Sequence, residues 1–417
     1  MDQAIAVVDI GKTRSKLSLW ATDGRPLRAF DRVNAIGVQT PRQLDLDVVS
    51  TWLKQALAEA ARLAEIVAIV PVGHGAAGVL MAQESPICAL DYEAPPPREI
   101  ASAYDHLRDQ FEATLSPRLE GGLNLGCQLY WLEHLSPELW PLAARFLLWP
   151  QYWAWWLSGE TASEVTSLGC HTDLWRPLER RFSDLAVTRG WAERLGPLCG
   201  AGEVLGEVRP ALAHELGLAR TCRVYCGLHD SNAALHGARG FDELAGRPFA
   251  VVSTGTWFIC FAAGGLGPVV YDPTRDMLAN VDVAGVPTPT ARFMGGRDFE
   301  AWMGGALGAA SDPALLREAA ALTDWRAATG PLRATRAALE LARRTDQTLS
   351  LVAAEGPILI EGRFAADDAF AVALARLRTG KAVYRSAIAD GVALGALQLA
   401  APHLRPNSPL HSVAADP

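Results

Sequence analysis

Four neighbouring polar residues in the middle of the chain could carry out acid–base chemistry. His229, Asp230, Ser231 and Asn232 lie between a short β-rich run and a run of small residues that favours a helix. Gly227 precedes them and permits a tight turn where the backbone must approach another group. Asp230 would then lie at a strand-to-helix junction, where a carboxylate can accept a proton from a substrate hydroxyl. On this stretch alone, a simple helix cap explains Asp230 equally well.

A short basic turn near the N-terminus could bind a polyanion. Residues 4–10 form an apolar run interrupted only by Asp9 and predict a buried strand, and residues 17–20 predict the next strand. Between them lie Gly11, Lys12, Thr13, Arg14, Ser15 and Lys16. Main-chain N–H groups, hydroxyls and cations on one turn suit an anion such as phosphate. An ordinary hydrophilic hairpin is the alternative.

The second half of the chain repeats this pattern. The motif Val-Val-x-x-Gly begins at Val7 and again at Val251, so Gly11 and Gly255 hold the same offset. Thr256 comes next, and the apolar residues 257–262 predict the following strand. The repeat is weak, but each turn supports the interpretation of the other as a phosphate-binding turn.

Residues 73–78 read G-H-G-A-A-G and match the glycine pattern of dinucleotide-binding folds. The run that follows is broken at residues 84–86, so no full helix opens on the glycines and no βαβ unit closes. We therefore predict that this turn lines a cleft, with His74 either a ligand contact or an ordinary turn residue. Nearby, the two acids of residues 91–93 flank an aromatic residue and could bind hydroxyl groups, or form a solvated strand end.

Alternating strands and helices must position these segments. An amphipathic pattern predicts a helix over residues 42–65, and a buried strand over residues 66–72 implies a parallel crossover. Residues 143–157 predict a helix whose tryptophans belong to the core, and residues 161–172 predict a loop. Further helices are predicted over residues 191–195, 210–216, 331–354, 367–377 and 390–401, with a Gly-Gly turn opening a helix within residues 292–300 and strands over 357–360 and 382–384. The fold class is therefore α/β, with two domains and a cleft between them.

Composition argues against several function classes. The 417 residues carry a net charge of −8 without a basic block, which argues against nucleic acid or an anionic membrane as the main partner. No apolar run reaches about 18 residues, and the N-terminus lacks the pattern of a signal peptide. Seven cysteines without a C-x-x-C spacing predict free thiols in a reducing compartment, and a zinc site is not expected. We predict a cytoplasmic globular protein.

Taken in order, these motifs resemble those of the FGGY carbohydrate kinases, which have the actin-like ATPase fold. The similarity extends over residues 4–401. Residues 9–13 resemble the first phosphate motif, residues 227–230 the segment with the catalytic aspartate, and residues 253–256 the second phosphate motif. The resemblance implies two ribonuclease-H-like domains with a central cleft. The N-terminal sugar-binding domain would be 1-221, and the C-terminal nucleotide-binding domain would be 222-417.

The resemblance also implies a role for each site residue. Asp230 would be the general base for a sugar hydroxyl, with ATP as the phosphoryl donor and Asp9 holding Mg²⁺ (Mg2+) through water. The phosphates would be bound by Gly11, Lys12, Thr13, Ser15 and Lys16 and, from the second domain, by Gly255 and Thr256, with Gly296 and Gly362 beside the nucleotide. The sugar would be faced by His74, Gly75, Asp91, His229 and Asp230.

Several positions depart from the family pattern. Lys12 replaces a small hydroxyl residue, and Arg363 replaces the second glycine of a pair near the adenosine. Residues 90–93 do not reproduce the family's tryptophan–acid–arginine segment, and the chain is shorter than most members. The turn at residues 255–257 and the pair at residues 229–230 look most similar to the branch that acts on L-rhamnulose or L-fuculose.

Three functions are therefore weighed. The first is ATP-dependent phosphorylation of a ketose, deoxyketose or sugar alcohol. The alternative is a non-catalytic sugar or nucleotide sensor that keeps the kinase fold, which Lys12 and Arg363 favour and the retained Asp9 and Asp230 oppose. A phosphotransferase acting on a phosphoanhydride or acyl phosphate is least supported, because no second basic cluster awaits an anionic acceptor. The expected partner is a small-molecule sugar, with no nucleic acid and no membrane, and a homodimer is left open.

Overall fold

The computed structural model describes residues 2–35, 37, 39–135, 137, 140–265, 267–304, 309–386 and 390–415. These residues form two compact units, each with its own sheet and buried core. The first unit comprises Met1–Gly237, Ala279–Pro287 and Asp390–Asn407, and the second comprises Ala238–Leu278, Thr288–Ala389 and Ser408–Pro417. Strands and helices in both units confirm the predicted α/β class.

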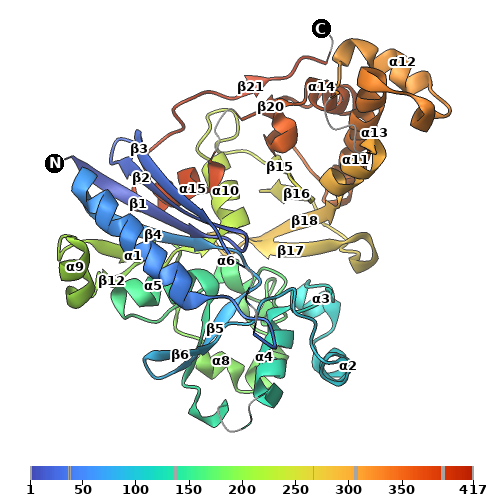
Figure 1. Ribbon diagram of the computed structural model, residues 1–417. Helices are drawn as coiled ribbons and strands as arrows, with labels where there is room; N and C mark the ends of the chain where they lie inside the picture. The colour runs from blue at the N-terminus through green and yellow to red at the C-terminus, as the bar shows by residue number, and fades with distance from the viewer. Residues whose placement is uncertain are drawn as a thin grey trace. The chain divides into compact units, whose positions relative to one another are not determined.

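The sheet of the first unit begins with the predicted meander (Figure 1). Strand β1 (Gln3–Ile10) pairs antiparallel with β2 (Arg14–Ala21), which pairs antiparallel with β3 (Pro26–Val33). Helix α1 (Leu46–Leu63) leads to β4 (Glu65–Gly73), which runs parallel to β1 as the crossover predicts. Beyond β4 the sheet continues with β13 (Arg223–Tyr225) and β14 (Leu228–His229), both parallel to β4, and with β12 (Val204–Glu207) at the edge.

The two faces of this sheet carry different helices. Successive side chains of a strand point to opposite faces, and Ala4, Ala6, Val8 and Ile10 of β1 pack in one core with α1 and α5 (Trp149–Ser158). The alternate residues Ile5 and Val7 pack with α10 (Asp230–Ala238) and α15 (Gly391–Ala400). In Figure 1, α15, in red, lies beside the blue strands of this sheet. Asp9 therefore points toward the face on which α10 and α15 lie.

The second unit repeats the strand order of the first. Strand β15 (Phe249–Thr254) pairs antiparallel with β16 (Phe258–Ala263), and β16 pairs antiparallel with β18 (Pro287–Phe293). On its other side β15 runs parallel to β19 (Ile358–Gly362), which runs parallel to β20 (Val383–Arg385). This matches the order β3, β2, β1, β4, β13, so the structure confirms the internal repeat. The core of this unit also contains α11 (Gly295–Met303), α13 (Gly330–Leu351) and α14 (Asp368–Leu377).

Two short segments differ from the sequence prediction. Residues 145–148 form strand β7 (Arg145–Leu148), paired with β5, and only then does α5 begin, with Pro150 in its first turn. A short apolar run fits a buried strand or a buried helix equally well, and proline marks the true helix start. Within the predicted loop 161–172, α6 (Val165–Leu168) forms because Glu164 caps it through the N–H groups of the next residues.

The remaining elements connect these parts. In the first unit they are β5 (Gly78–Ala82), β6 (Ser85–Cys88), α2 (Arg98–Leu107), α3 (Phe111–Thr114), α4 (Leu125–Leu135), β8 (Ser163–Glu164), β9 (Trp175–Arg176), β10 (Arg181–Phe182), α7 (Asp184–Thr188), α8 (Trp191–Arg194), β11 (Leu198–Cys199) and α9 (Pro210–Leu216). The others are β17 (Met277–Val281), α12 (Leu316–Ala321) and β21 (His411–Ser412). All seven cysteines are free thiols. Among the residues that the structure describes, no helix combines the length and apolar character needed to span a membrane.

The first compact unit extends past the predicted domain boundary between residues 221 and 222. It continues to Gly237, because β13 and β14 pair with β4 and α10 packs on the same sheet. The compact units are set by strand pairing and helix packing. The division at residues 221 and 222 into a sugar-binding and a nucleotide-binding domain stays a prediction.

Candidate active site

Asp230 lies where the sequence predicts, at the junction of β14 and α10. Gly227 interrupts the strand with φ of +76°, and a Cβ atom there would lie 2.1 Å from the carbonyl oxygen of Pro71. Only glycine permits this approach to β4. Asp230 is the first residue of α10, and its Oδ1 accepts a 2.6 Å hydrogen bond from the N–H of Ser231. The carboxylate keeps 32% of its side-chain surface exposed.

His229 connects Asp230 to a buried thiol. Its Nε2 lies 3.1 Å from Asp230 Oδ1 and 3.5 Å from the Sγ of Cys170, and its Nδ1 lies 3.0 Å from the side-chain nitrogen of Asn232. Burial opposes charge on His229, but Cys170 and Asp230 outweigh it and hold the pKa of His229 well above its usual value. Burial likewise opposes ionisation of Asp230, yet the charge of His229 lowers the pKa of Asp230 overall. Asp230 is thus held as a carboxylate beside an imidazolium.

The main chain at His229 is fixed by a short relay of buried side chains. The N–H of His229 donates to Thr166 Oγ1 at 3.0 Å, and the Thr166 hydroxyl donates to Glu164 at 2.6 Å. Glu164 is fully buried, and burial raises its pKa to about 7 although its hydrogen bonds from residues 166 and 167 oppose the rise. This relay joins α6 to the end of β14.

Asp9 lies among charged groups at the end of β1. It pairs in the sheet with Lys16 of β2, so both side chains lie on the α10 and α15 face. Lys16 donates to Asp390, the residue that caps α15. Burial raises the pKa of Asp9 to about 7; Asp230 and Asp390 add to the rise, and Lys16 counteracts it. The Oδ1 atom of Asp9 is buried and has no hydrogen-bond partner among the described residues.

The first turn is shaped by its own hydrogen bonds. The N–H of Gly11 donates to the carbonyl of Arg14 at 3.0 Å. The fully buried Ser15 hydroxyl donates to Asn34 at 2.9 Å, and the Asn34 amide donates to the Gly11 carbonyl at 2.8 Å. Ser15 therefore holds the turn, together with a bond from Asn34 N–H to the carbonyl of Thr13 at 2.9 Å.

Lys12 leaves this turn and contacts the acidic segment predicted beside it. Its Nζ lies 2.7 Å from Asp91 Oδ1, 2.7 Å from Glu93 Oε2 and 4.2 Å from the centre of the Tyr92 ring. Arg42 holds the other oxygen of Asp91, with 2.7 Å between Nε and Oδ2. The structure thus brings Lys12 and Asp91 together as one charge cluster.

His74 and Gly75 lie against these groups. A Cβ atom on Gly75 would lie 2.6 Å from Cys170 Sγ and 3.0 Å from the His229 ring, so only glycine fits. The His74 ring contacts Tyr92 edge-on with centroids 5.4 Å apart and Trp149 at 5.6 Å. Burial lowers the pKa of His74 to about 4, and neither ring nitrogen has a hydrogen-bond partner among the described residues. Trp149 belongs to the core, as predicted.

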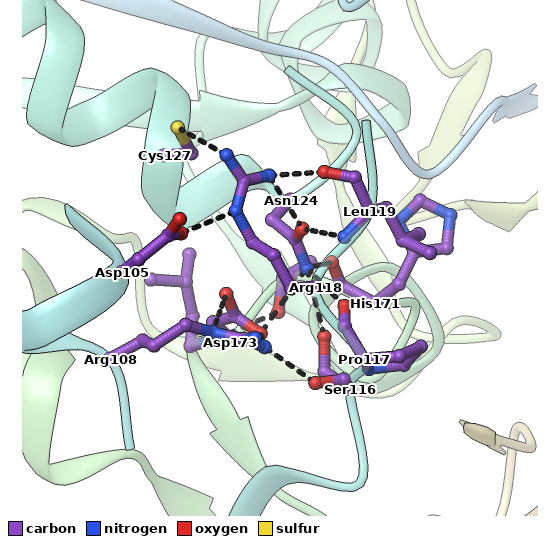
Figure 2. A network of polar contacts seen from close by, with 12 residues as sticks. Asp105, Arg108, Ser116, Pro117, Arg118, Leu119, Asn124, Cys127, His171 and Asp173 are labelled. Atoms are coloured by element: carbon purple, nitrogen blue, oxygen red, sulfur yellow. Dashed lines mark hydrogen bonds and ion pairs between the residues drawn. The ribbon is translucent and has the colours of Figure 1, made fainter. Parts of the chain in front are cut away.

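A buried polar network supports the segment that carries Cys170 (Figure 2). His171 and Asp173 have positive φ values of 39° and 65°, conformations that side chains rarely adopt. Asn124 donates to the His171 carbonyl at 3.1 Å, and Asp173 accepts from Tyr104 at 2.5 Å and from Arg108 at 2.8 Å. These bonds offset the local strain and fix the position of Cys170.

The second turn is built from glycines and uncharged residues. The N–H of Gly255 donates to the carbonyl of Trp257 at 3.0 Å. A Cβ atom on Gly296, at the start of α11, would lie 2.1 Å from the Gly255 carbonyl. Gly362 has φ of +82°, and its Cβ would lie 2.2 Å from the Thr254 carbonyl. The sequence-predicted residues Gly255, Thr256, Gly296 and Gly362 therefore come together within the second unit.

Arg363, the residue in place of a family glycine, points to α11. Its guanidinium lies 2.7 Å from Glu300 Oε1, and both side chains are half exposed. The structure thus gives this departure a local partner within the second unit.

Several contributors to the site escaped sequence reasoning as site residues, among them Cys170, Asp390, Arg42 and Tyr92. Asp390 had a signal, because an acid before a small-residue helix is a typical cap. Cys170 had none, since 59 residues separate it from His229. Across the described ranges, no group of three or more His, Cys, Asp or Glu side chains is arranged to hold a metal ion.

Comparisons with known proteins decide the family. The family description "Carbohydrate kinase FGGY, C-terminal domain" matches residues 246–332 and 317–408. The crystal structure of a carbohydrate kinase from Novosphingobium aromaticivorans is 40% identical and matches with a TM-score of 0.91, covering 98% of this chain and 94% of that chain. This chain belongs to the FGGY carbohydrate kinase family. It is therefore a phosphotransferase with an alcohol group as acceptor.

More distant structures share the fold of this carbohydrate kinase. The ligand-bound xylulose kinase from Lactobacillus acidophilus is 14% identical with a TM-score of 0.75, covering 95% of this chain and 89% of that chain. The Plasmodium falciparum glycerol kinase with ADP is 12% identical with a TM-score of 0.75 and the same coverage. A search of curated proteins found no match. The fold is thus that of two ribonuclease-H-like domains, as predicted.

Proposed function

We propose that this carbohydrate kinase transfers the γ-phosphoryl group of ATP to a hydroxyl of a ketose, deoxyketose or sugar alcohol, with Asp230 as general base. One observation carries the proposal: a partly exposed carboxylate at the start of α10, kept ionised by His229 at 3.1 Å. Phosphoryl transfer depends mostly on positioning and on charge stabilisation. The carboxylate takes the proton of the sugar hydroxyl as the new P–O bond forms and the bond to the leaving ADP breaks.

Asp9 is the residue proposed to hold Mg²⁺, through water. The fit rests on its buried Oδ1, which lacks a hydrogen-bond partner among the described residues. It also rests on the negative charge around Asp9, because Asp230 and Asp390 both add to the rise in the pKa of Asp9 and Lys16 is the opposing cation. Bound Mg²⁺ would neutralise phosphate charge.

The phosphates are proposed to bind at the glycine turns of the two units. In the first unit the candidates are Gly11, Thr13, Ser15 and Lys16, with Ser15 acting by shaping the turn from its buried position. In the second unit they are Gly255 and Thr256, with Gly296 and Gly362 beside the nucleotide. The sugar is assigned to the N-terminal domain, at His74, Gly75, His229 and Asp230, and the nucleotide to the C-terminal domain.

The first test is ADP release with Mg-ATP against ketoses, deoxyketoses including L-rhamnulose and L-fuculose, pentitols and tetritols. One strong substrate would support the proposal and identify the sugar class. Binding of sugar and nucleotide without turnover across the panel would contradict it and favour the non-catalytic sensor.

A further inference from the structure

The side chain of Lys12 is already paired with acidic and aromatic side chains of this protein. Its ammonium makes two ion pairs of 2.7 Å, to Asp91 and to Glu93, and faces the Tyr92 ring at 4.2 Å. Only 11% of the side chain is exposed. An ammonium has three donor positions, and here two meet carboxylates while the π-face of Tyr92 attracts the charge further.

The charges balance within the cluster formed by Lys12, Arg42, Asp91 and Glu93. Arg42 contacts the second oxygen of Asp91 at 2.7 Å and Glu93 at 3.4 Å, so two cations meet two carboxylates. Asp91 is 2% exposed, and its Oδ1 also accepts the N–H of Glu93 at 2.9 Å. A carboxylate so occupied is suited to hold a loop rather than to bind a hydroxyl itself. Asp91 is therefore a positioning residue in this account.

The charge cluster orients an aromatic wall. Tyr92 lies between the two acids in the sequence, and its ring meets His74 edge-on, while His74 also contacts Trp149. His74 is neutral at physiological pH, so it offers one N–H donor and one nitrogen acceptor. A hydroxyl group offers the matching acceptor and donor. The two ring nitrogens of His74 are buried and have no hydrogen-bond partner among the described residues, so they suit the hydroxyl groups of an uncharged polyol.

We propose that Lys12 is a specificity-determining residue of the sugar subsite, where it holds Asp91 and Glu93 so that Tyr92 and His74 face a neutral sugar. It does not serve as a phosphate ligand, in contrast to the expectation from its place in the first turn. This inference rests on the proposed function as a sugar kinase. It names the substrate class as neutral ketoses or polyols rather than sugar acids, because every cation of the cluster already faces a carboxylate.

The test compares Lys12→Met with Arg14→Gln. Arg14 lies two residues further along, at the start of β2, but is 64% exposed and pairs with Asp31, so it is a matched control. Dissociation constants are measured by calorimetry for ADP and for D-xylulose, L-rhamnulose, L-fuculose, xylitol, erythritol and D-gluconate. Lys12→Met should weaken the best neutral ligand at least about tenfold, or 1.4 kcal/mol, and leave ADP affinity within about threefold. The control should change neither.

Other outcomes overturn the inference. They are a loss of ADP affinity with unchanged sugar affinity, tighter binding of D-gluconate than of any neutral ligand, or no sugar binding by the wild-type protein. If Lys12→Met fails to fold, Glu93→Gln decides, because Glu93 is 57% exposed and its loss spares the core. That variant should weaken sugar binding alone, and an unchanged sugar affinity would overturn the inference. Sugar binding that depends on Lys12 without phosphoryl transfer would contradict the proposed function and still support this inference.

Discussion

The two glycine turns of this kinase lie at the same place in the strand pattern but differ in length and in surroundings. Each turn connects two antiparallel strands. In each, the glycine N–H donates a 3.0 Å hydrogen bond: Gly11 to the carbonyl of Arg14, and Gly255 to the carbonyl of Trp257. In each unit the strand before the turn is also flanked by a parallel strand, β4 or β19. The shared placement follows from the repeated strand order, but the first turn is longer: residues 11–14 lie between the paired residues Ile10 and Ser15, whereas only residues 255–257 lie between Thr254 and Phe258.

The two turns also differ in charge. Asp9 pairs with Lys16 in the first sheet, whereas Ser253, two residues before Gly255, pairs with Ile259 in the second. The second turn is instead packed by glycines that allow main-chain atoms to approach closely. In our proposal, the repeated strand pattern thus supports charge chemistry in the first unit and main-chain binding of the nucleotide in the second.

The largest expected effect on kcat among these comparisons comes from replacing Asp9, the acid just before the first glycine turn. Asp9→Asn should lower kcat by about 10²–10³-fold, the size seen when a group that stabilises transition-state charge is lost. The matched change in the other repeat, Ser253→Ala, should cost less than about fivefold, or one ordinary hydrogen bond. Steady-state ADP release measures both. Equal losses in the two variants would break the comparison.

A glycine substitution should disturb the second unit through the backbone. Gly362→Ala places a Cβ atom 2.2 Å from the Thr254 carbonyl at φ of +82°. We expect a loss of about 1–3 kcal/mol in unfolding free energy from backbone strain, together with weaker ADP binding. Gly265→Ala is the control, since no atom of the described chain lies within 4 Å of its added Cβ. If urea unfolding shows no difference between the two variants, the close backbone approach at Gly362 is contradicted.

His74 should make the first unit sensitive to acid. Because its pKa falls from 6.5 to about 4 on folding, the unfolded chain binds a proton before the folded protein does as pH drops. The contribution of neutral His74 to the unfolding free energy is therefore fully present above pH 6.5 and is lost as the pH falls toward 4. Relative to His74→Asn, the wild type should lose unfolding free energy on the order of 3 kcal/mol across this window. A pH-independent difference would contradict the burial of the neutral ring.

The smallest expected effect concerns Arg363. Its pair with Glu300 is half exposed on both sides, and such pairs contribute less than about 1 kcal/mol. Arg363→Ala should therefore change unfolding free energy and ADP binding by no more than that amount. A larger loss of ADP affinity, measured by calorimetry, would make Arg363 a nucleotide contact.

Local patterns predicted much of the fold and part of the site. The apolar run of β1, the glycine of the first turn and the strand-to-helix junction at Asp230 all depend on neighbouring residues. The partners of Lys12 and Lys16 could not be predicted, because Asp91 lies 79 residues from Lys12 and Asp390 lies 374 residues from Lys16. Such contacts are set by the strand order and by helix packing. The strand at residues 145–148 was missed because its apolar run carries no period.

The most direct test of the account is the turnover of Asp230→Asn with the best sugar from the panel. The variant should lose at least about 10²-fold in kcat, because the proton acceptor is removed, while calorimetry shows unchanged affinities for sugar and ADP. Asp31→Asn, which removes a carboxylate from an exposed pair with Arg14, should keep full activity. Full activity of Asp230→Asn would contradict the central claim that this carboxylate is the general base.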